Sequence, residues 1–172
     1  MTRWFEDVEL DVDYPLGTHV FTADAIADFR AQYDPFSAGD VASGWHLAVV
    51  GHRLMVDTLA AESARIRAEG REPGVSGPSP GINRINFPRT VSAGEAVSYT
   101  LSVSAKRPSN SLPGWGLLIN HLTGLNAAGE LVYEAEVAAF IKRRDFTPNA
   151  RQRIALMLTR LPVVGKWLAS RR

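Results

Sequence analysis

A serine–glycine pair, Ser43-Gly44, begins the longest apolar periodic run of the sequence, and a carboxylate, Asp34, precedes it in a proline-containing segment. A serine at a helix N-cap accepts a hydrogen bond from a first-turn amide, and glycine lets a ligand approach the positive end of the helix dipole. Such an end can bind an anion or a developing oxyanion. Asp34 falls at the predicted C-terminal end of a shorter helix, where the dipole opposes a negative charge. These residues predict a site for acid–base or oxyanion chemistry; the alternative is that Ser43 is only a cap in a tightly packed turn.

Histidines are the usual partners of such a carboxylate, and the sequence holds four of them: His19, His46, His52 and His121. His46 stands nearest to Ser43 and is our candidate third residue of the site; the alternative places its ring in the core or against another subunit. His52 is interpreted as a core or interface residue, and the other two lie in predicted strands. No histidine has the i, i+4 spacing to a carboxylate that favours a metal site, so we expect neither a metal nor another cofactor.

Two helices would position these residues. From Ser43 to about Ala64, apolar residues recur at three- and four-residue steps without a proline, which predicts a long helix buried on more than one side. The shorter helix begins after Thr22, its predicted N-cap, and ends before Pro35.

The remaining elements are predicted strands. Val8 to Tyr14 alternates in polarity and predicts an extended segment, with a turn at 15–17 and a second short strand at 19–21. After a loop at 73–81, four strands are expected in antiparallel succession, over 81–87, 96–105, 116–125 and 131–141. Residues 126–129 form a predicted hairpin turn between the last two. One long helix followed by these strands predicts an α+β hot-dog fold, an antiparallel sheet wrapped around one central helix.

Such a sheet leaves strand edges unpaired and one apolar face uncovered. We therefore expect a homodimer or a higher even-numbered oligomer, with the pocket at its interface.

Composition narrows the protein class. A length of 172 residues suits one domain with a tail, and 45% hydrophobic and 22% charged residues are ordinary for a globular protein. The absence of cysteine excludes disulfides, thiolate metal sites and cysteine nucleophiles. No apolar leader-like stretch stands at the start and no uncharged run reaches membrane-spanning length, so we expect a cytoplasmic protein.

The net charge of +1 conceals a division along the chain. Residues 1–141 hold 10 Lys and Arg against 17 Asp and Glu, whereas residues 142–172 hold 9 against 1. An acidic body is not typical of a nucleic-acid-binding domain, so nucleic acid is not expected as a partner. We divide the chain into a domain at 1–145 and a basic tail at 146–172, with an amphipathic helix predicted over 149–161. We expect this helix to dock on the acidic body; contact with an anionic membrane is the less favoured alternative.

Four segments together resemble the MaoC-like dehydratases, hot-dog proteins related to the (R)-specific enoyl-CoA hydratases. The segments are 17–35 (GTHVFTADAIADFRAQYDP), 42–46 (ASGWH), 79–82 (SPGI) and 88–95 (PRTVSAGE). The resemblance covers roughly residues 17–144 and leaves out the tail. It implies hydration of a trans-2-enoyl thioester of coenzyme A or of an acyl carrier protein, or dehydration of the 3-hydroxyacyl thioester, as in fatty acid metabolism.

The resemblance also implies roles for residues. In that family an aspartate and a histidine five positions later activate a water, and an amide at the start of the central helix polarises the thioester carbonyl. Asp34 stands at the aspartate position, and Ser43 and Gly44 stand at the helix start. The histidine is absent, because Gly39 occupies its position and the loop looks shorter than in the family. Because acid–base catalysis contributes about 10²- to 10⁴-fold, an Asp-only site would be slow rather than inactive.

Two alternatives therefore remain open. A hot-dog thioesterase would use a carboxylate near the central helix to attack or activate water at the thioester carbonyl, and Asp34, Asp40 and Asp57 are the candidates. A non-catalytic acyl-thioester-binding subunit would pair with an active homologue, and the missing histidine favours it.

Overall fold

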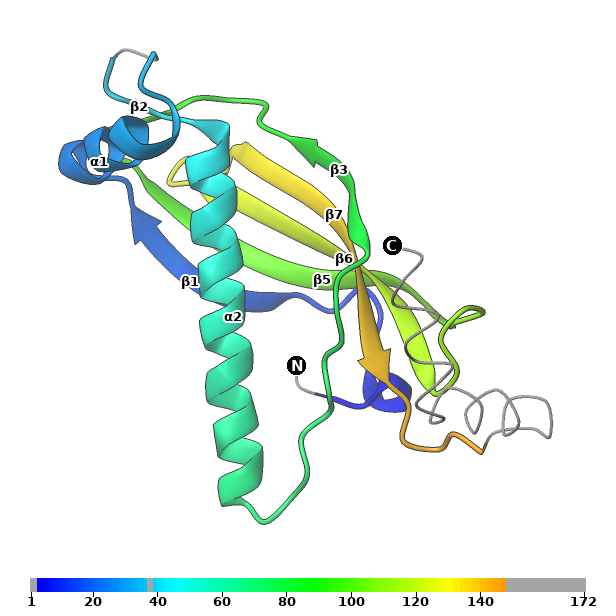
Figure 1. Cartoon of the computed structure of the whole chain (residues 1–172). Coiled ribbons are helices and arrows are strands. Elements are labelled where there is room, and N and C mark those ends of the chain that lie inside the picture. Colours follow the sequence, from blue (N-terminus) through cyan, green and yellow to red (C-terminus); the bar gives the residue numbers. More distant parts are fainter. Residues whose placement is uncertain (1–2, 37–38, 148–172) are drawn as a thin grey trace.

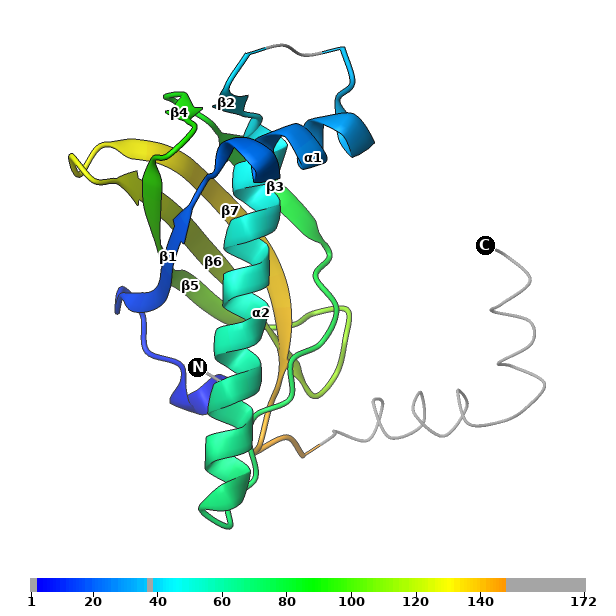
Figure 2. The same cartoon turned by 90° about the vertical axis from the view of Figure 1, so that its left-hand side faces the viewer.

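Helix α2 (Gly44–Ala68) lies across one face of a five-stranded antiparallel sheet, which confirms the predicted hot-dog arrangement (Figure 1). The computed structural model describes residues 3–36 and 39–147. The helix begins at the predicted residue and continues past the predicted end near Ala64. Figure 2 shows the sheet on one side of α2, with α1 (Ala23–Tyr33) beside the first turns of the helix.

The sheet has the strand order β1-β5-β6-β7-β3. The bounds of these strands are β1 (Tyr14–Val20), β3 (Gly81–Asn86), β5 (Ala96–Pro108), β6 (Trp115–Asn126) and β7 (Leu131–Lys142). Only the last three strands are neighbours in succession, joined by hairpins whose polar turns reverse the chain. Strand β3 pairs with β7 at the far edge, so the expected succession of four strands is wrong at its first member. The predicted turn at Asn126 to Gly129 is confirmed, since the amide of Gly129 donates to the carbonyl of Asn126 at 2.9 Å.

The N-terminal strand differs from the prediction. Residues 15–17 do not turn the chain but lie inside β1, whose pairing with β5 shifts register between Pro15 and Gly17. A proline is tolerated because β1 is an edge strand, and Gly17, with φ of 121°, accommodates the bulge. The alternating stretch from Val8 to Asp13 is not a strand, and a 3-10 turn, η1 (Phe5–Asp7), precedes it.

Both helix starts are capped as predicted. The Thr22 side chain accepts a hydrogen bond from the amide of Ala25 at 3.2 Å, and that of Ser43 accepts one from His46 at 3.2 Å. A two-stranded ribbon, β2 (Val41–Ala42) with β4 (Val91–Ser92), holds the chain just before α2. The sequence pattern predicted a loop and a turn for these two segments, which are too short to show an alternation.

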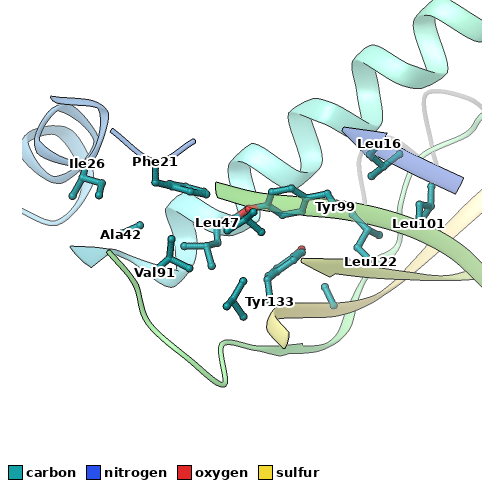
Figure 3. Packing of buried hydrophobic residues seen from close by; sticks show 13 residues of the cluster. Leu16, Phe21, Ile26, Ala42, Leu47, Val91, Tyr99, Leu101, Leu122 and Tyr133 are labelled. Carbon is teal, nitrogen blue, oxygen red and sulfur yellow. The ribbon is translucent and has the colours of Figure 1, made fainter. Parts of the chain in front are cut away.

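The core lies between the first half of α2 and the sheet (Figure 3). The Tyr99 hydroxyl donates to the carbonyl of Leu47 at 3.0 Å, which joins β5 to the helix. The added Cβ of an alanine at Gly51 would lie 2.9 Å from the Tyr99 ring, so the glycine permits this close approach. The largest fully buried side chains are those of Tyr99, Phe21, Leu47, Leu101, Val91, Val97, Val103 and Val132.

The two ends of the described domain are tied together by charges. Arg144 pairs with Asp7, and Arg143 lies 3.5 Å from a carboxylate oxygen of Glu6. The amide of Arg144 also donates to Glu6 at 3.0 Å and, with burial opposing it, helps to lower the pKa of that carboxyl. The helix predicted over 149–161 lies outside the described residues. Among the helices of the described part, none is long and apolar enough to cross a membrane.

Candidate active site at the start of the central helix

Asp34 is placed by the end of α1. It is the C-cap of that helix, its amide donates to the carbonyl of Arg30 at 2.9 Å, and Pro35 prevents the helix from continuing. Its side chain is half-buried. The carboxylate therefore stands at the negative end of the α1 dipole, as the sequence predicted.

Ser43 and Gly44 are placed by the start of α2. Because the Ser43 side chain caps the amide of His46, the amides of Gly44 and Trp45 remain among the donors without a partner inside the helix. These two amides lie at the positive end of a 25-residue helix. The helix start can thus stabilise negative charge on an oxygen atom.

One pocket brings Asp34 and Ser43 together. It has a volume of about 380 Å³, and its other lining residues are Phe29, Tyr33, Trp45 and Val49. Trp45 and Val49 also line a larger cavity of 590 Å³, which runs between α2 and the sheet. The pocket at Asp34 and Ser43, whose walls are otherwise mainly aromatic and apolar, therefore adjoins the larger cavity along the helix.

An aromatic cluster surrounds Gly44. The Phe87 ring lies so close that an added Cβ at Gly44 would be 2.5 Å from its Cδ2 atom. Phe87 also stacks on Tyr133, with ring centroids 5.9 Å apart, and meets Trp45 edge-on at 6.3 Å. Burial raises the pKa of Tyr133 to about 12, so this hydroxyl keeps its proton and can act as a hydrogen-bond donor.

The side chain of His46 lies away from that pocket. It is 7% exposed, stacks on Phe29 with ring centroids 4.5 Å apart, and meets Phe21 edge-on at 5.0 Å. Burial, with the neighbouring His19 adding to it, lowers the pKa of His46, so the ring is held neutral. Its Nδ1 atom is buried without a hydrogen-bond partner among the described residues. The geometry is that of a core residue that supports the helix start, which is the alternative position considered above.

The other three histidines are also remote from Asp34. His19 packs edge-on against Phe21 at 4.8 Å. His121 faces Glu134 at 3.4 Å on the outer surface of the sheet. His52 lines the larger cavity from the α2 side. None of them lines the pocket that holds Asp34.

Gly39, at the position of the family histidine, is turned away from the pocket wall. Its carbonyl accepts a hydrogen bond from the Arg30 guanidinium, and its φ is 94°. A Cβ added there would meet no atom within 4 Å. The backbone at this position suits glycine and directs a side chain into open space.

The other two candidate carboxylates, Asp40 and Asp57, do not line this pocket. Asp57 forms an ion pair with Arg53 at 2.7 Å on the exposed face of α2. Asp40 is exposed, and its carbonyl accepts from the amide of Ala93 at 2.8 Å. In the described residues, no cluster of three or more His, Asp or Glu side chains could hold a metal ion.

Sequence reasoning missed four residues: Tyr33, Asn120 and Tyr133, which line the two pockets, and Phe87, which packs against Gly44. Phe87 and Tyr133 are ordinary strand-region aromatics whose meeting with Gly44 depends on long-range pairing. Asn120 did carry a signal, because it is the one polar side chain among the buried alternating positions of β6. Tyr33 adjoins Asp34 in the sequence, and its helical phase with Phe29 was visible.

The arrangement of this sheet around one long helix is the hot-dog fold. No family model matches the sequence, and no curated protein sequence matches it. Among solved structures, a MaoC-like dehydratase from Rhodospirillum rubrum is similar, at 22% identity over 83% of this chain and 99% of that one, with a TM-score of 0.63. A monoamine oxidase regulatory protein from Archaeoglobus is 18% identical over 84% of this chain and 95% of that one, with a TM-score of 0.64. A double hot-dog protein from Mycobacterium tuberculosis is 15% identical over 85% of this chain and 46% of that one, with a TM-score of 0.55. The predicted resemblance is thereby confirmed at the level of the fold.

Proposed function

We propose that this protein is a hydro-lyase for acyl thioesters, hydrating trans-2-enoyl thioesters of coenzyme A or an acyl carrier protein, or dehydrating the 3-hydroxyacyl thioesters. The observation that carries the proposal is the pocket shared by Asp34 and Ser43, which adjoins an apolar cavity of 590 Å³. An acyl chain suits the cavity, and the thioester group suits the smaller pocket, where Asp34 and Ser43 supply polar groups.

The roles follow from the chemistry of the reaction. Asp34 acts as the base that takes a proton from water while the water oxygen bonds to the β-carbon, and the amides after Ser43 stabilise the enolate oxygen that forms at the thioester carbonyl. The carboxyl of Asp34 then returns the proton to the α-carbon as the enolate reverts to the thioester. Gly44, which has no side chain, leaves room for the Phe87 ring to pack beside these amides. His46 contributes through its position, since its amide completes the cap and its ring anchors the first turn on Phe29.

Hydration of an enoyl-CoA tests the proposal directly. We expect slow loss of the enoyl absorbance with crotonyl-CoA and a longer enoyl-CoA, and a loss of about 10²-fold or more in Asp34→Asn, because the variant lacks the base. Asp28→Asn, an exposed change on the same helix, is the control and should keep the rate. If wild type and Asp34→Asn both react at the rate of buffer, the hydro-lyase proposal is wrong.

A non-catalytic acyl-thioester-binding subunit is the second candidate. It is favoured by a specific observation: none of the residues lining the Asp34 pocket is a histidine, and Gly39 turns away from that pocket. Binding of an acyl-CoA without any turnover, together with rate recovery on mixing with a histidine-bearing homologue, would support this candidate.

A hot-dog thioesterase is the third candidate. Because Asp57 is ion-paired and Asp40 is exposed, this activity would also depend on Asp34. Release of free thiol from a saturated acyl-CoA, measured with a thiol reagent, separates it from the hydro-lyase.

We further propose that the protein acts as a homodimer or a higher even-numbered oligomer in the cytoplasm. Apolar side chains on one face of α2 are exposed, at 61% for Trp45 and 55% for Val49, and Ile82 of the edge strand β3 is 53% exposed. A second copy can pair with this open edge and cover these side chains, which also line the cavity. Light scattering of the intact chain measures the state, and a monomer would contradict the proposal.

A further inference from the structure

Asn120 is a polar residue in an apolar row. The buried positions of β6 alternate along the strand and face α2, and on either side of Asn120 they are occupied by Leu118 and Leu122. Across the sheet, Asn120 is paired with Val103 of β5 and Val137 of β7. The side chain is 9% exposed. A primary amide therefore stands in the middle of the hydrophobic wall.

The amide of this side chain makes no hydrogen bond to any other residue in the described part of the chain. A carboxamide holds two donors and an acceptor with two lone pairs, and burying them without partners opposes folding. A leucine would fill the same row without that penalty. Stability alone therefore does not explain an asparagine at this position.

The amide opens into the cavity. Asn120 lines the 590 Å³ space, and His52 lines it from the helix on the opposite wall. Small side chains widen the cavity at this level, among them Ala139 of β7. The amide thus borders a space that can hold a ligand atom able to donate or accept a hydrogen bond.

The position of Asn120 is remote from the helix start. Strand β7 and helix α2 run toward the same end of the molecule (Figure 1). The Tyr133 ring lies 3.4 Å from an added Cβ at Gly51, and Val137, the partner of Asn120, is four residues further along β7. Four strand residues span roughly 13 Å. A ligand group at Asn120 would therefore lie well along the acyl chain, away from the thioester.

We propose that Asn120 is a specificity residue for acyl thioesters that carry an oxygen substituent, a hydroxyl or keto group, on the distal part of the acyl chain. The inference rests on the proposed acyl-thioester site and names its substrate class. The amide nitrogen donates to a keto oxygen, and the amide oxygen accepts from a hydroxyl. An unsubstituted chain leaves the amide without a partner in the complex.

Binding of saturated thioesters tests this inference separately from the hydration reaction, because these ligands cannot be hydrated. Titration calorimetry compares decanoyl-CoA with its chain-terminal and mid-chain hydroxy and keto derivatives. We expect at least one oxygenated derivative to bind wild type roughly fivefold or more tightly than decanoyl-CoA. In Asn120→Leu the preference should be lost or reversed. His121→Leu, on the same strand but on the outer face, is the matched control and should retain it.

Each outcome decides between the two proposals. If decanoyl-CoA binds but no oxygenated derivative binds better, the inference about Asn120 is wrong while the acyl-thioester site stands. A preference that survives in Asn120→Leu overturns the inference as well. If no acyl-CoA binds to wild type, both the site and the inference fail. Should Asn120→Leu not fold, Asn120→Ala takes its place. The inference then requires that the preference for the oxygenated derivative is lost in Asn120→Ala and retained in His121→Leu, and a preference that persists in Asn120→Ala overturns it.

Discussion

Replacing Gly44 by alanine tests the contact that shapes the start of α2. A Cβ at this position would lie 2.5 Å from Phe87 Cδ2, whereas ordinary contacts begin at 3.4 Å, so the ring must move by about 0.9 Å. Phe87 is 36% exposed, and it packs on Tyr133 and Trp45. Displacing the ring outward weakens both contacts.

The expected magnitude follows from the area involved. An outward shift that uncovers on the order of 50–75 Å² of the ring costs about 1–2 kcal/mol. Alanine recovers only a few tenths of a kcal/mol at a first helical position, less than the ~1 kcal/mol of a helix interior. We therefore expect Gly44→Ala to lower the free energy of unfolding by about 1–2 kcal/mol.

Urea unfolding of four proteins isolates the contact: wild type, Gly44→Ala, Phe87→Ala and the double variant. The midpoint should fall in Gly44→Ala with the slope unchanged. In the Phe87→Ala background the same glycine substitution should be neutral or stabilising, because the obstructing ring is gone. An equal loss in both backgrounds would refute the reasoning, since the cost would then arise from the backbone rather than from Phe87.

Two further outcomes are expected. Gly39→His should destabilise the fold by roughly 1–3 kcal/mol, because φ is 94°, and should not raise the hydration rate, because the side chain would meet open space. Gly39→Ala is the control, since it has the same backbone strain without the imidazole. A rate gain in Gly39→His that Gly39→Ala does not share would contradict the placement of this loop. For His46, burial lowers the pKa in the folded state, so the unfolded chain binds the proton more readily than the folded protein does. The contribution of His46 to the free energy of unfolding is therefore fully present above the ordinary pKa of about 6.5 and is lost as the pH falls below that value. His46→Phe keeps the stacking on Phe29 and should flatten the dependence of the unfolding midpoint on pH between about 7 and 5; an unchanged slope would assign that dependence to other groups.

Local signals in the sequence predicted the elements that hold the candidate site. Thr22 and Ser43 are both caps, because a hydroxyl before an apolar periodic run satisfies orphan amides wherever the helix later packs. Pro35 ends α1 for an equally local reason, which leaves Asp34 at its C-cap. The pocket that joins Asp34 to Ser43 agrees with the proximity that the resemblance implied.

Long-range pairing explains what the sequence did not predict. Pro15 and Gly17 are typical turn residues, so the sequence predicted a chain reversal there. Only the pairing with β5 shows that they form a bulge inside a strand. The contact of Phe87 with Gly44 depends on where β3 leaves the far edge of the sheet. The position of the His46 side chain was ambiguous in the sequence, because a rotation of the helix by one residue would place it either on the pocket wall or against Phe21 and Phe29, where the structure has it.

The strand order has a consequence for how the protein folds. Strands β5, β6 and β7 are consecutive hairpins, so their pairing closes only short loops. Strand β1 pairs with β5 across more than 80 residues, as in the pair Tyr14 and Leu101, and β3 pairs with β7 across more than 45, as in the pair Asn86 and Glu134. Contacts between distant residues form slowly because the loop entropy is lost before they stabilise the chain.

We infer that the three-stranded meander forms first and the two edges dock on it later. The same edges then open most readily in the folded protein, and β3, which borders the cavity through Ile82, gives the binding site its most easily opened wall.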